Sequence, residues 1–338
     1  MRRLKFVLAA VPITLMLVLG VFSAAAYAAT PLPNGFTAAV VATSGQKITG
    51  TIVATGYDVG IYIGPSVHNV KVNEATVSGA NDEGILVQDA SNVLIENSTI
   101  KDNAIAILVG LTETKGIVLA GARNCLVKNN TITGNGDGGI SVLDDGPSFV
   151  FAPTAISSSP IAGTGNVITE NLIQDNPGGC GIVLSAKNPG GGVSHNVVSK
   201  NTVLGFNPAG GDFFPGVGGI IVAGGAFGPV NLEKNVIQDN VVTGGFIPGI
   251  SLHAFGPAAI TGTKLIDNKL SNNGGTGDRV SNDTTGTEIF AVPVGTISHT
   301  QVLTDTVSND YYGVWHAGDV GTHIAHLMTN GVTVPVGP

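Results

Sequence analysis

The sequence predicts an all-β solenoid, in which short strands follow one another around a coil and the coils stack. The first observation is a recurring motif: Asn, any residue, an aliphatic residue, two residues, Asn. Clear copies begin at Asn130, Asn171, Asn235 and Asn268, and four looser copies lie between residues 75 and 310. The second is that the segments around these copies alternate apolar with polar or small residues at period two, which indicates strands rather than helices.

A stack of coils is the arrangement that lets such short strands share one core. Three strands in a coil of about 22 residues cannot bury an apolar face alone, whereas stacked coils enclose a continuous interior. Glycine clusters separate the strands, and the chain contains 49 glycines in 338 residues. We expect the Asn side chains at matching corners to form ladders, each amide donating to one neighbouring corner and accepting from the other.

Residues 1–28 have the pattern of a signal peptide. Arg2, Arg3 and Lys5 precede an apolar run over residues 6–22, and Ala26-Tyr27-Ala28 fits the small-x-small cleavage pattern. A retained membrane anchor is the alternative. The sequence therefore predicts a secreted, extracellular or cell-surface protein, with no membrane span once the signal is removed.

The rest of the chain divides into two expected parts. Residues 29–58 form an N-terminal cap, and residues 59–338 form about nine or ten coils, some of them with long loops. Near the end, Gly313-Val314 begins one more strand of the Gly-Ile type, and residues 333–336 form a closing edge strand, where proline is tolerated. Cys125 and Cys180 occupy different repeat positions, which disfavours a disulfide between them.

Two series of equivalent residues follow from the repeat. One series lies two residues after each motif start, and we expect it to stack as an inward ladder: Ile100, Ile132, Ile173, Val203, Ile237, Leu270 and Val307. The other lies on the Gly-Ile strand and should point outward: Tyr62, Leu86, Ser141, Val183, Ile221, Ser251, Phe290 and Trp315, followed by Gln88, Leu143, Ser185, Ala223 and His253.

The repeats resemble those of the right-handed parallel β-helices of the pectate-lyase-like superfamily, over about residues 46 to 338. The resemblance implies that fold, and it implies that a ligand would lie along the outward face of one parallel sheet. It does not imply an activity, because the superfamily contains lyases, hydrolases, epimerases, phage tailspikes and adhesins.

The predicted outward face carries few groups for polysaccharide chemistry. A lyase needs a Lys or Arg base and a neutraliser for the uronate carboxylate, often Ca²⁺, and a glycoside hydrolase needs two carboxylates. The nearest carboxylates, Asp137, Asp144 and Asp145, flank one Gly-Ile strand and are the candidate catalytic residues. The adjacent Asp144-Asp145 pair is similar to the paired-Asp segment of polygalacturonases, although the other motifs of that family are missing and a solvated turn is the simpler interpretation.

Candidate substrate-binding residues lie on or beside this face. They are Tyr62, Ser141, Lys187, Ser251, His253 and Trp315, and Lys187 would be the base of a lyase. The sequence Ala-Phe-Gly-Pro occurs at residues 226–229 and 254–257, on consecutive coils. The phenylalanines either wall a groove for sugar rings or fold down as a satellite core. No metal site is expected, because the seven histidines share no repeat position.

Charge and composition limit the function further. The net charge of -8 argues against nucleic-acid partners, which require basic surfaces. The sequence favours a glycan-binding, surface-binding or structural β-helix, with a polysaccharide or cell-surface glycan as partner and no cofactor. The alternative is a lyase, hydrolase or epimerase acting on an acidic polysaccharide, and a Ca²⁺ ion enters only under that alternative.

Overall fold

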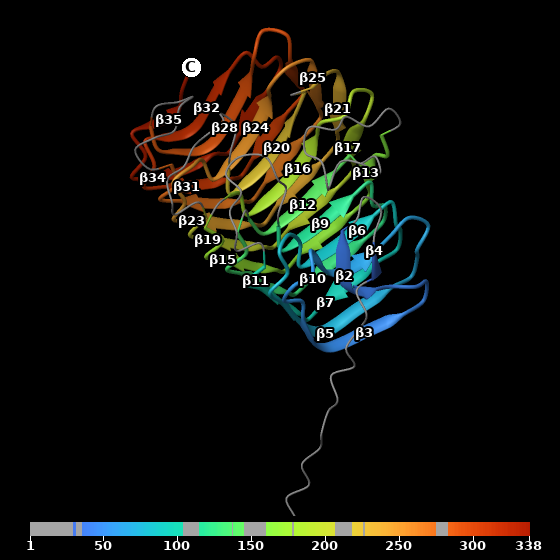
Figure 1. Ribbon diagram of the computed structural model, residues 1–338. Helices are drawn as coiled ribbons and strands as arrows, with labels where there is room; N and C mark the ends of the chain where they lie inside the picture. Colours follow the sequence, from blue (N-terminus) through green and yellow to red (C-terminus); the bar gives the residue numbers. More distant parts are fainter. Residues whose placement is uncertain are drawn as a thin grey trace, which may run out of the picture.

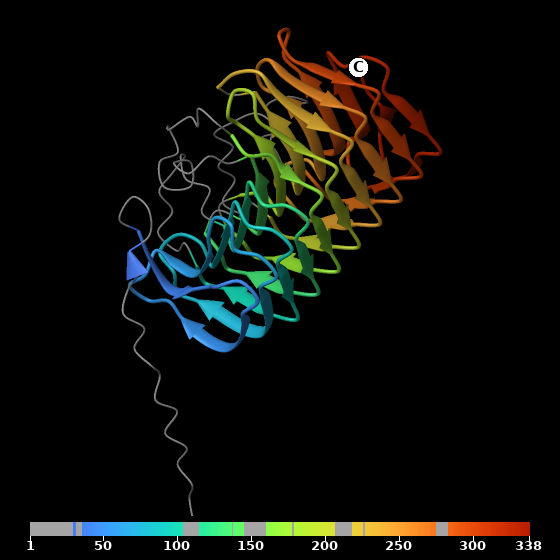
Figure 2. The ribbon, with the colours of Figure 1, turned by 90° about the vertical axis from the view of Figure 1, so that its right-hand side faces the viewer.

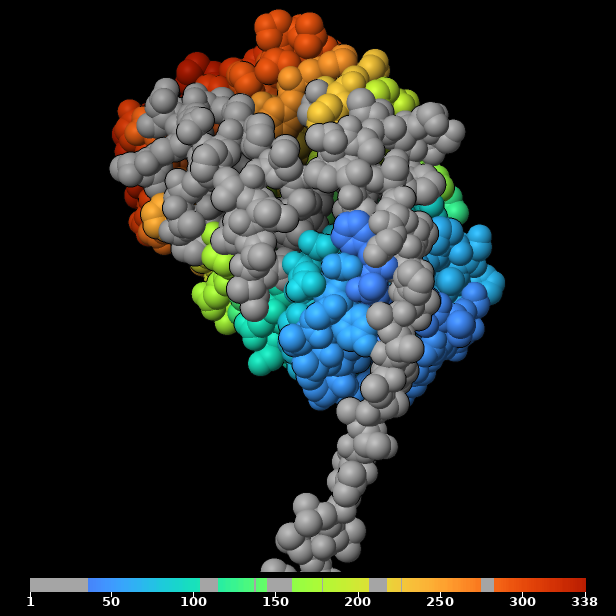
Figure 3. All heavy atoms as spheres, in the orientation of Figure 1, coloured from blue at the N-terminus to red at the C-terminus, as the bar shows by residue number. Residues whose placement is uncertain are grey.

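The chain forms an elongated stack of coils made of short parallel strands (Figures 1 and 2). The computed structural model describes residues 30–31, 36–103, 115–136, 138–144, 160–177, 179–206, 218–225, 227–274 and 283–338. The part of the chain within these ranges contains strands, turns and bends but no helix. In Figure 3, described residues near the N-terminus (blue) lie at one end of the molecule and those near the C-terminus (orange and red) at the other.

The strands form three parallel sheets, and sheet A, which contains the Gly-Ile strands, runs the length of the stack. Its order is the chain order: β1 (Thr30–Pro31), β2 (Thr37–Val41), β4 (Val59–Ile63), β6 (Ile85–Gln88), β9 (Ile117–Ala120), β12 (Ile140–Leu143), β16 (Ile182–Ala186), β20 (Ile220–Gly224), β24 (Ile250–Ala254), β28 (Thr285–Ala291), β32 (Tyr312–Ala317) and β35 (Val334–Val336). Within residues 59–338, the ten strands from β4 to β35 agree with the predicted nine or ten coils.

Sheet B consists of two ladders that the long strands β3 (Lys47–Val53) and β5 (Lys71–Ser78) join at the N-terminal end. The first ladder contains β7 (Leu94–Glu96), β10 (Leu126–Lys128), β14 (Val167–Thr169), β18 (Val197–Ser199), β22 (Val236–Gln238), β26 (Lys264–Ile266), β30 (Gln301–Leu303) and β33 (His323–Ala325). The second contains β8 (Thr99–Lys101), β11 (Thr131–Thr133), β15 (Leu172–Gln174), β19 (Thr202–Leu204), β23 (Val241–Thr243), β27 (Lys269–Ser271), β31 (Thr306–Ser308) and β34 (Met328–Asn330).

Sheet C is shorter and appears only in the later coils. Its strands are β13 (Gly163–Thr164), β17 (Gly192–Ser194), β21 (Val230–Glu233), β25 (Ala258–Thr261) and β29 (Thr296–Ser298). Neighbouring coils pair in parallel in all three sheets, and β1 pairs with β2 in antiparallel fashion. The segment expected to be a cap thus supplies β2 and β3, which pair in parallel with β4 and β5.

The core is a set of aliphatic ladders along the axis of the stack. The predicted inward ladder is correct for six of its seven members, because Ile100, Ile132, Ile173 and Val203 pair in register and the ladder continues to Leu270 and Val307. Ile237 is the exception. It pairs with Val198 in the first ladder of sheet B, and Val242 takes the place predicted for it.

The error at Ile237 has a simple cause. Each coil has two successive short strands in sheet B with the same polar-aliphatic-polar pattern, and both end at an Asn corner. The motif Asn235-x-Ile237-x-x-Asn240 begins one corner earlier in its coil than the motif Asn171-x-Ile173-x-x-Asn176 does. The two motifs look alike in the sequence, so aligning them assigns Ile237 to the wrong ladder. Ile237 is nevertheless fully buried, because both strands direct their aliphatic residue inward.

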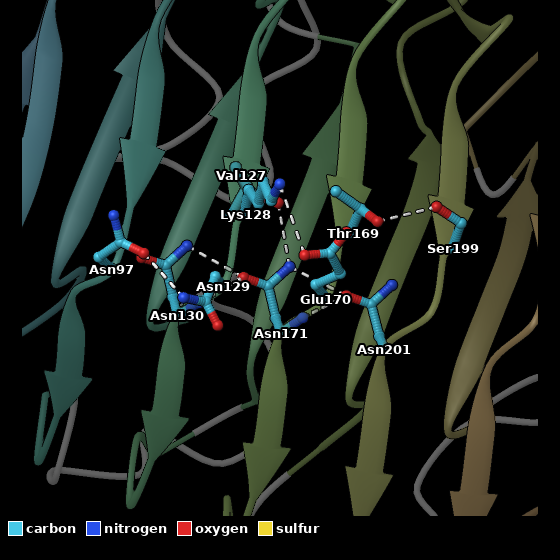
Figure 4. A network of polar contacts seen from close by, with 10 residues as sticks. All are labelled: Asn97, Val127, Lys128, Asn129, Asn130, Thr169, Glu170, Asn171, Ser199 and Asn201. Atoms are coloured by element: carbon cyan, nitrogen blue, oxygen red, sulfur yellow. Dashed lines mark hydrogen bonds and ion pairs between the residues drawn. The ribbon is translucent and has the colours of Figure 1, made fainter.

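The corner Asn residues form the predicted ladders (Figure 4). At one corner, the side-chain Nδ2 of Asn130 donates to Oδ1 of Asn171 at 3.0 Å, and Asn171 Nδ2 donates to Asn201 Oδ1 at 2.9 Å. Each Nδ2 also donates to a main-chain carbonyl, as Asn130 does to Ile95 at 3.0 Å. The residue before each rung adopts a left-handed backbone conformation, such as Asn129 with a φ of 52°. The ladders therefore satisfy turn groups that are buried inside the solenoid.

The two cysteines are both buried and form no disulfide with each other. Cys125 occupies a ladder position, where its main-chain N–H donates to Asn166 Oδ1 at 3.0 Å. Burial raises the pKa of the Cys125 thiol to about 11, so this residue acts as a small core side chain.

Candidate functional site

The outer face of sheet A corresponds to the outward face of the Gly-Ile strands, on or beside which the sequence predicts the site residues. Alternate residues of its strands point inward and outward. The inward residues, such as Ile85 and Ile140, belong to the main core. The first outward row consists of Tyr62, Leu86, Val118, Ser141, Val183, Ile221, Ser251, Glu288 and Trp315. The second consists of Gln88, Ala120, Leu143, Ser185, Ala223, His253, Phe290 and Ala317.

This register corrects one sequence expectation. Phe290 was placed in the first row, but it pairs with His253 in the second row, and Glu288 pairs with both Ser251 and Trp315. The strand β28 begins with Thr285-Gly286-Thr287, where Thr287 stands in for the usual isoleucine. That substitution hid the Gly-Ile signal and shifted the predicted row by two residues. As a result, the sequence analysis missed a carboxylate on the outward face.

The N-terminal part of the outer face is a second, smaller core. Tyr62, Leu86, Val118 and Leu143 pack together with Ala38 and other residues, and they are almost fully buried. The hydroxyl of Tyr62 donates to Gln88 Oε1 at 2.8 Å. Ser141 is fully buried as well, and its Oγ has no hydrogen-bond partner within the described ranges. Of these residues, Tyr62 and Ser141 were candidates for substrate binding, and both lie beneath the surface.

The carboxylate of Asp144 accepts hydrogen bonds from main-chain groups at a corner of the next coil. Its Oδ1 accepts a hydrogen bond from the main-chain N–H of Lys187 at 2.7 Å, and its Oδ2 accepts one from Asn188 N–H at 3.0 Å. The amide of Asn188 donates back to the Asp144 carbonyl at 2.9 Å. Burial raises the pKa of Asp144 to about 6, although these hydrogen bonds oppose the shift. Asp144 thus has a structural use, and the half-buried Lys187 lies beside it. Asp137 and Asp145 lie outside the described residues.

The C-terminal part of the outer face combines aromatic rings with polar side chains. We define the C-terminal cluster by six residues of β24, β28, β32 and the turn after β24: Ser251, His253, Phe255, Glu288, Phe290 and Trp315. Ser251, Glu288 and Trp315 are in-register neighbours across three strands. Three of the predicted substrate-binding residues, Ser251, His253 and Trp315, therefore lie on the same face, with Glu288 of β28 between Ser251 and Trp315.

The rings of the cluster form a continuous row. His253 stacks on Phe255 with centroids 4.2 Å apart and an interplanar angle of 10°, and it meets Phe290 edge-on at 4.8 Å. Phe290 lies 6.1 Å from Trp315. Phe255, Phe290 and Trp315 are each half-buried, so one side of the row faces solvent. Such partly exposed rings provide flat apolar surface next to polar groups.

The polar side chains of the cluster are buried. Ser251 and His253 are 0% exposed and Glu288 is 1% exposed. In the described part of the chain, neither ring nitrogen of His253 nor the Oγ of Ser251 has a hydrogen-bond partner. Burial lowers the pKa of His253 to about 4, so the imidazole is neutral at pH 7 and carries one donor and one acceptor. Buried polar groups are normally satisfied, so unpartnered polar atoms directly beneath a row of half-exposed rings set this part of the face apart.

Another buried pair lies at the corner before sheet A. Main-chain hydrogen bonds from Gly60 to Glu83 and from Gly84 to Lys115 place Glu83 and Lys115 at the same repeat position of neighbouring coils. Glu83 is 1% exposed and Lys115 is 4% exposed. The adjacent Asp82 has a pKa raised to about 6 by burial and by the charge of Asp58. Lys115 and Glu83 each directly precede the Gly-Ile pair that begins a strand of sheet A, at Gly116-Ile117 and Gly84-Ile85.

The described residues contain neither a metal-binding group of side chains nor a membrane-spanning helix. Within those ranges, no three His, Cys, Asp or Glu side chains are grouped so that they could hold a metal ion. The same ranges contain no helix that is both long and apolar enough to cross a membrane.

Comparisons with known proteins agree on the fold. Residues 28–153 match the family model described as a right handed beta helix region. No curated protein matches the sequence. Solved structures that resemble the chain include the Agl-KA catalytic domain, with a TM-score of 0.52, 16% identity and coverage of 88% of this chain and 54% of that one.

Two further similar structures have different roles. One is the periplasmic alginate epimerase AlgG, with a TM-score of 0.54, 12% identity and coverage of 89% of this chain and 64% of that one. The other is PfbA, a surface adhesin of Streptococcus pneumoniae, with a TM-score of 0.53, 11% identity and coverage of 82% and 64%. The chain thus spans less than two thirds of the length of each of these three structures. At these identities the likeness concerns the fold, and the protein is a right-handed parallel β-helix.

Proposed function

We propose that the protein binds a glycan through the C-terminal cluster. The observation that carries this proposal is the position of two buried polar side chains, Ser251 and His253, beside a row of half-exposed aromatic rings. Ligand sites in proteins are typically apolar surfaces with a few convergent polar groups. A sugar ring matches this combination, because its C–H face packs on an aromatic ring while its hydroxyls exchange hydrogen bonds with nearby polar atoms.

The chemistry of the cluster favours a neutral sugar over a uronate. His253 is uncharged at pH 7 and therefore offers no positive charge to a carboxylate. Glu288 lies in the same outward row, next to both Ser251 and Trp315, and the cluster contains no Lys or Arg that could bind the carboxylate of a uronate. Among the similar structures, one is named as an alginate epimerase and one as a surface adhesin, which supports a role at polysaccharides or surfaces without choosing between binding and catalysis.

The test is affinity electrophoresis of the mature protein in gels that contain neutral β-glucan, mannan, alginate or pectin. We expect a neutral polymer to retard the wild-type protein. Trp315→Ala should weaken this interaction about tenfold or more, because aromatic side chains dominate such contacts. Phe246→Ala is the matched control, since Phe246 is also an exposed aromatic (47%) but lies before β24, at the opposite end of that strand from His253. Retardation by none of the polymers, or equal retardation of all three proteins, would refute the proposal.

A second candidate function, modification of a polysaccharide, is favoured by one arrangement in the same cluster. A hydroxyl, an imidazole and a carboxylate lie on adjacent positions of β24 and β28, and these are the groups used in acid–base and nucleophilic catalysis. The same polymers are incubated with the protein, and reducing ends and unsaturated products are measured. Product formation that Glu288→Gln abolishes would favour this second function. Retardation without product favours binding alone.

A further inference from the structure

Two of the corner ladders end in aspartates rather than asparagines. One ladder runs through Asn201, Asn240 and Asn268 to Asp305, and the other includes Asn273 and ends at Asp310. Both aspartates are buried, at 0% and 2% exposure, in the coil that contains β28, β30 and β31. This coil also carries Glu288, and the next one carries Trp315.

Each asparagine rung uses both ends of its amide. The side chain of Asn268 accepts hydrogen bonds at Oδ1 from Asn240, and its Nδ2 donates to Asp305 at 3.1 Å and to the main-chain carbonyl of Ile237 at 2.9 Å. Asn240 does the same, donating to the carbonyl of Val198 at 3.0 Å. A rung therefore needs one acceptor atom, directed to the previous coil, and one donor atom.

The aspartates supply the acceptor but, when ionised, not the donor. Asp305 Oδ1 accepts from the N–H of Asn268 at 2.8 Å, and Asp310 Oδ1 accepts from the N–H of Asn273 at 2.6 Å. In both residues Oδ2 is buried and has no hydrogen-bond partner among the described residues. The asparagine rungs donate to main-chain carbonyls of the previous coil, such as that of Ile237. For the aspartates, which lie one coil further on, the equivalent carbonyls belong to Leu265 and Leu270, which pair in register with Ile237 and Val242. Each Oδ2 thus stands where other rungs direct an N–H toward a main-chain carbonyl, which can only accept.

We propose that Asp305 and Asp310 are proton-dependent closing rungs, and that loss of their protons loosens the last two coils of the solenoid. A proton on Oδ2 makes the carboxyl group equivalent to an amide: one oxygen accepts and the other donates. Ionisation removes the donor and leaves two buried oxygens facing each other. The device would make the coils that carry Glu288 and Trp315 more rigid in mildly acidic surroundings than in alkaline ones.

The surroundings of both carboxyl groups favour the protonated form. Burial raises the pKa of Asp305 to about 7, with a contribution from the charge of Asp267, and burial raises the pKa of Asp310 to about 7. The left-handed corner position beside Asp305 is occupied by Asp267, Thr304 and His326 in successive coils, and His326 is exposed. The titratable neighbours of Asp310 are Tyr311 and Tyr312, which follow it in the chain, and Asp283, which precedes β28. Tyr311 and Asp283 are exposed.

The experiment is hydrogen exchange of the full mature chain, measured by mass spectrometry at pH 5.5 and pH 8 and expressed as protection factors, which removes the intrinsic pH dependence of exchange. For the wild type we expect protection in residues 312–338 to fall about tenfold or more between the two pH values, while residues 164–204 change little. The double variant Asp305→Asn/Asp310→Asn keeps the shape and supplies the donor at every pH, so its protection should be high and equal at both.

Matched variants keep the result interpretable. Asp239→Asn removes a charge at the exposed corner position just before rung Asn240, and it should leave the wild-type pH response unchanged. The single variants Asp305→Asn and Asp310→Asn should each remove part of the response. The proposal is overturned if the double variant retains the full pH response, or if Asp239→Asn abolishes it.

Discussion

Ile173 tests the inward ladder at the level of one side chain. It lies between Ile132 and Val203 in the second ladder of sheet B and is 1% exposed. Ile173→Ala should lower the free energy of unfolding by about 2–5 kcal/mol, through lost burial and a cavity that the tightly stacked neighbours cannot fill. Urea denaturation measures the change. Gln174→Ala, at the neighbouring outward position, is the control, and a loss below about 0.5 kcal/mol for Ile173→Ala would contradict the packing.

Phe206 and Gly245 occupy two positions of one corner ladder where other coils have Asn. Their contact gives a second prediction at the residue scale. A side chain added at Gly245 would meet the ring of Phe206, so Gly245→Ala should destabilise the protein by about 1–3 kcal/mol through overpacking. Combining it with Phe206→Ala removes the clash. The double variant should therefore be more stable than the sum of the two single changes predicts, as measured by a double-mutant cycle. Strict additivity would mean that the two positions do not touch.

Individual residues also show where sequence reasoning succeeded and where it stopped. Ser251, His253 and Trp315 could be placed on the outward face because glycine followed by isoleucine or valine marks the start of their strands. Glu288 could not, because Thr287 replaces the isoleucine that sets the register. Asp144 was identified by its position, but only the structure shows that its carboxylate is occupied by the N–H groups of Lys187 and Asn188.

A rung of the Asn ladder is the element that fixes each corner, and Asn130 provides its test. Asn130 is buried and hydrogen-bonds with Asn171, Ile95 and Ser98. Asn130→Ala should cost about 2–4 kcal/mol, because buried main-chain groups lose their partners. The neighbouring Asn129 also hydrogen-bonds across coils, to Asn97 at 2.7 Å, but in an exposed position (Figure 4).

Asn129→Gly is the matched comparison for this rung. Glycine adopts the left-handed conformation of Asn129 without strain, so only an exposed hydrogen bond is lost. We expect a change below about 1 kcal/mol in thermal or urea unfolding. Equal effects of the buried and the exposed substitution would show that the ladder does not support the corner.

The sequence predicted that such ladders exist but not which of two similar corners each motif occupies, as Ile237 illustrates.

At the scale of the whole molecule, the buried carboxyl groups predict how stability depends on pH. The pKa values of Asp82 and Asp144 are raised to about 6, and those of Asp305 and Asp310 to about 7, from an ordinary value of 3.8. Between the ordinary pKa of 3.8 and the raised pKa of each group, the folded chain binds more protons than the unfolded chain. Its free energy of unfolding therefore falls as the pH rises from about 4 through about 7.

Thermal unfolding followed by circular dichroism measures this trend. The midpoint should be higher at pH 5 than at pH 8, which is opposite to the behaviour of a protein whose carboxylates are held ionised by salt bridges. The partly exposed surface pairs Lys71–Glu96 at 2.7 Å and Lys128–Glu170 at 3.5 Å contribute little to either value, because solvent screens them. A midpoint that rises from pH 5 to pH 8 would contradict the prediction.

The most direct test of a glycan site on the C-terminal cluster uses the intrinsic fluorescence of tryptophan, because Trp315 is the single tryptophan of the chain. Neutral oligosaccharides are titrated into the mature protein while its emission is recorded. A sugar stacked on the half-buried ring should produce a saturable change in intensity or wavelength, and Ser251→Ala/His253→Ala should weaken the titration while leaving the starting spectrum similar. Binding detected by electrophoresis without any change in the emission of Trp315 would contradict the account and place the glycan elsewhere on the solenoid.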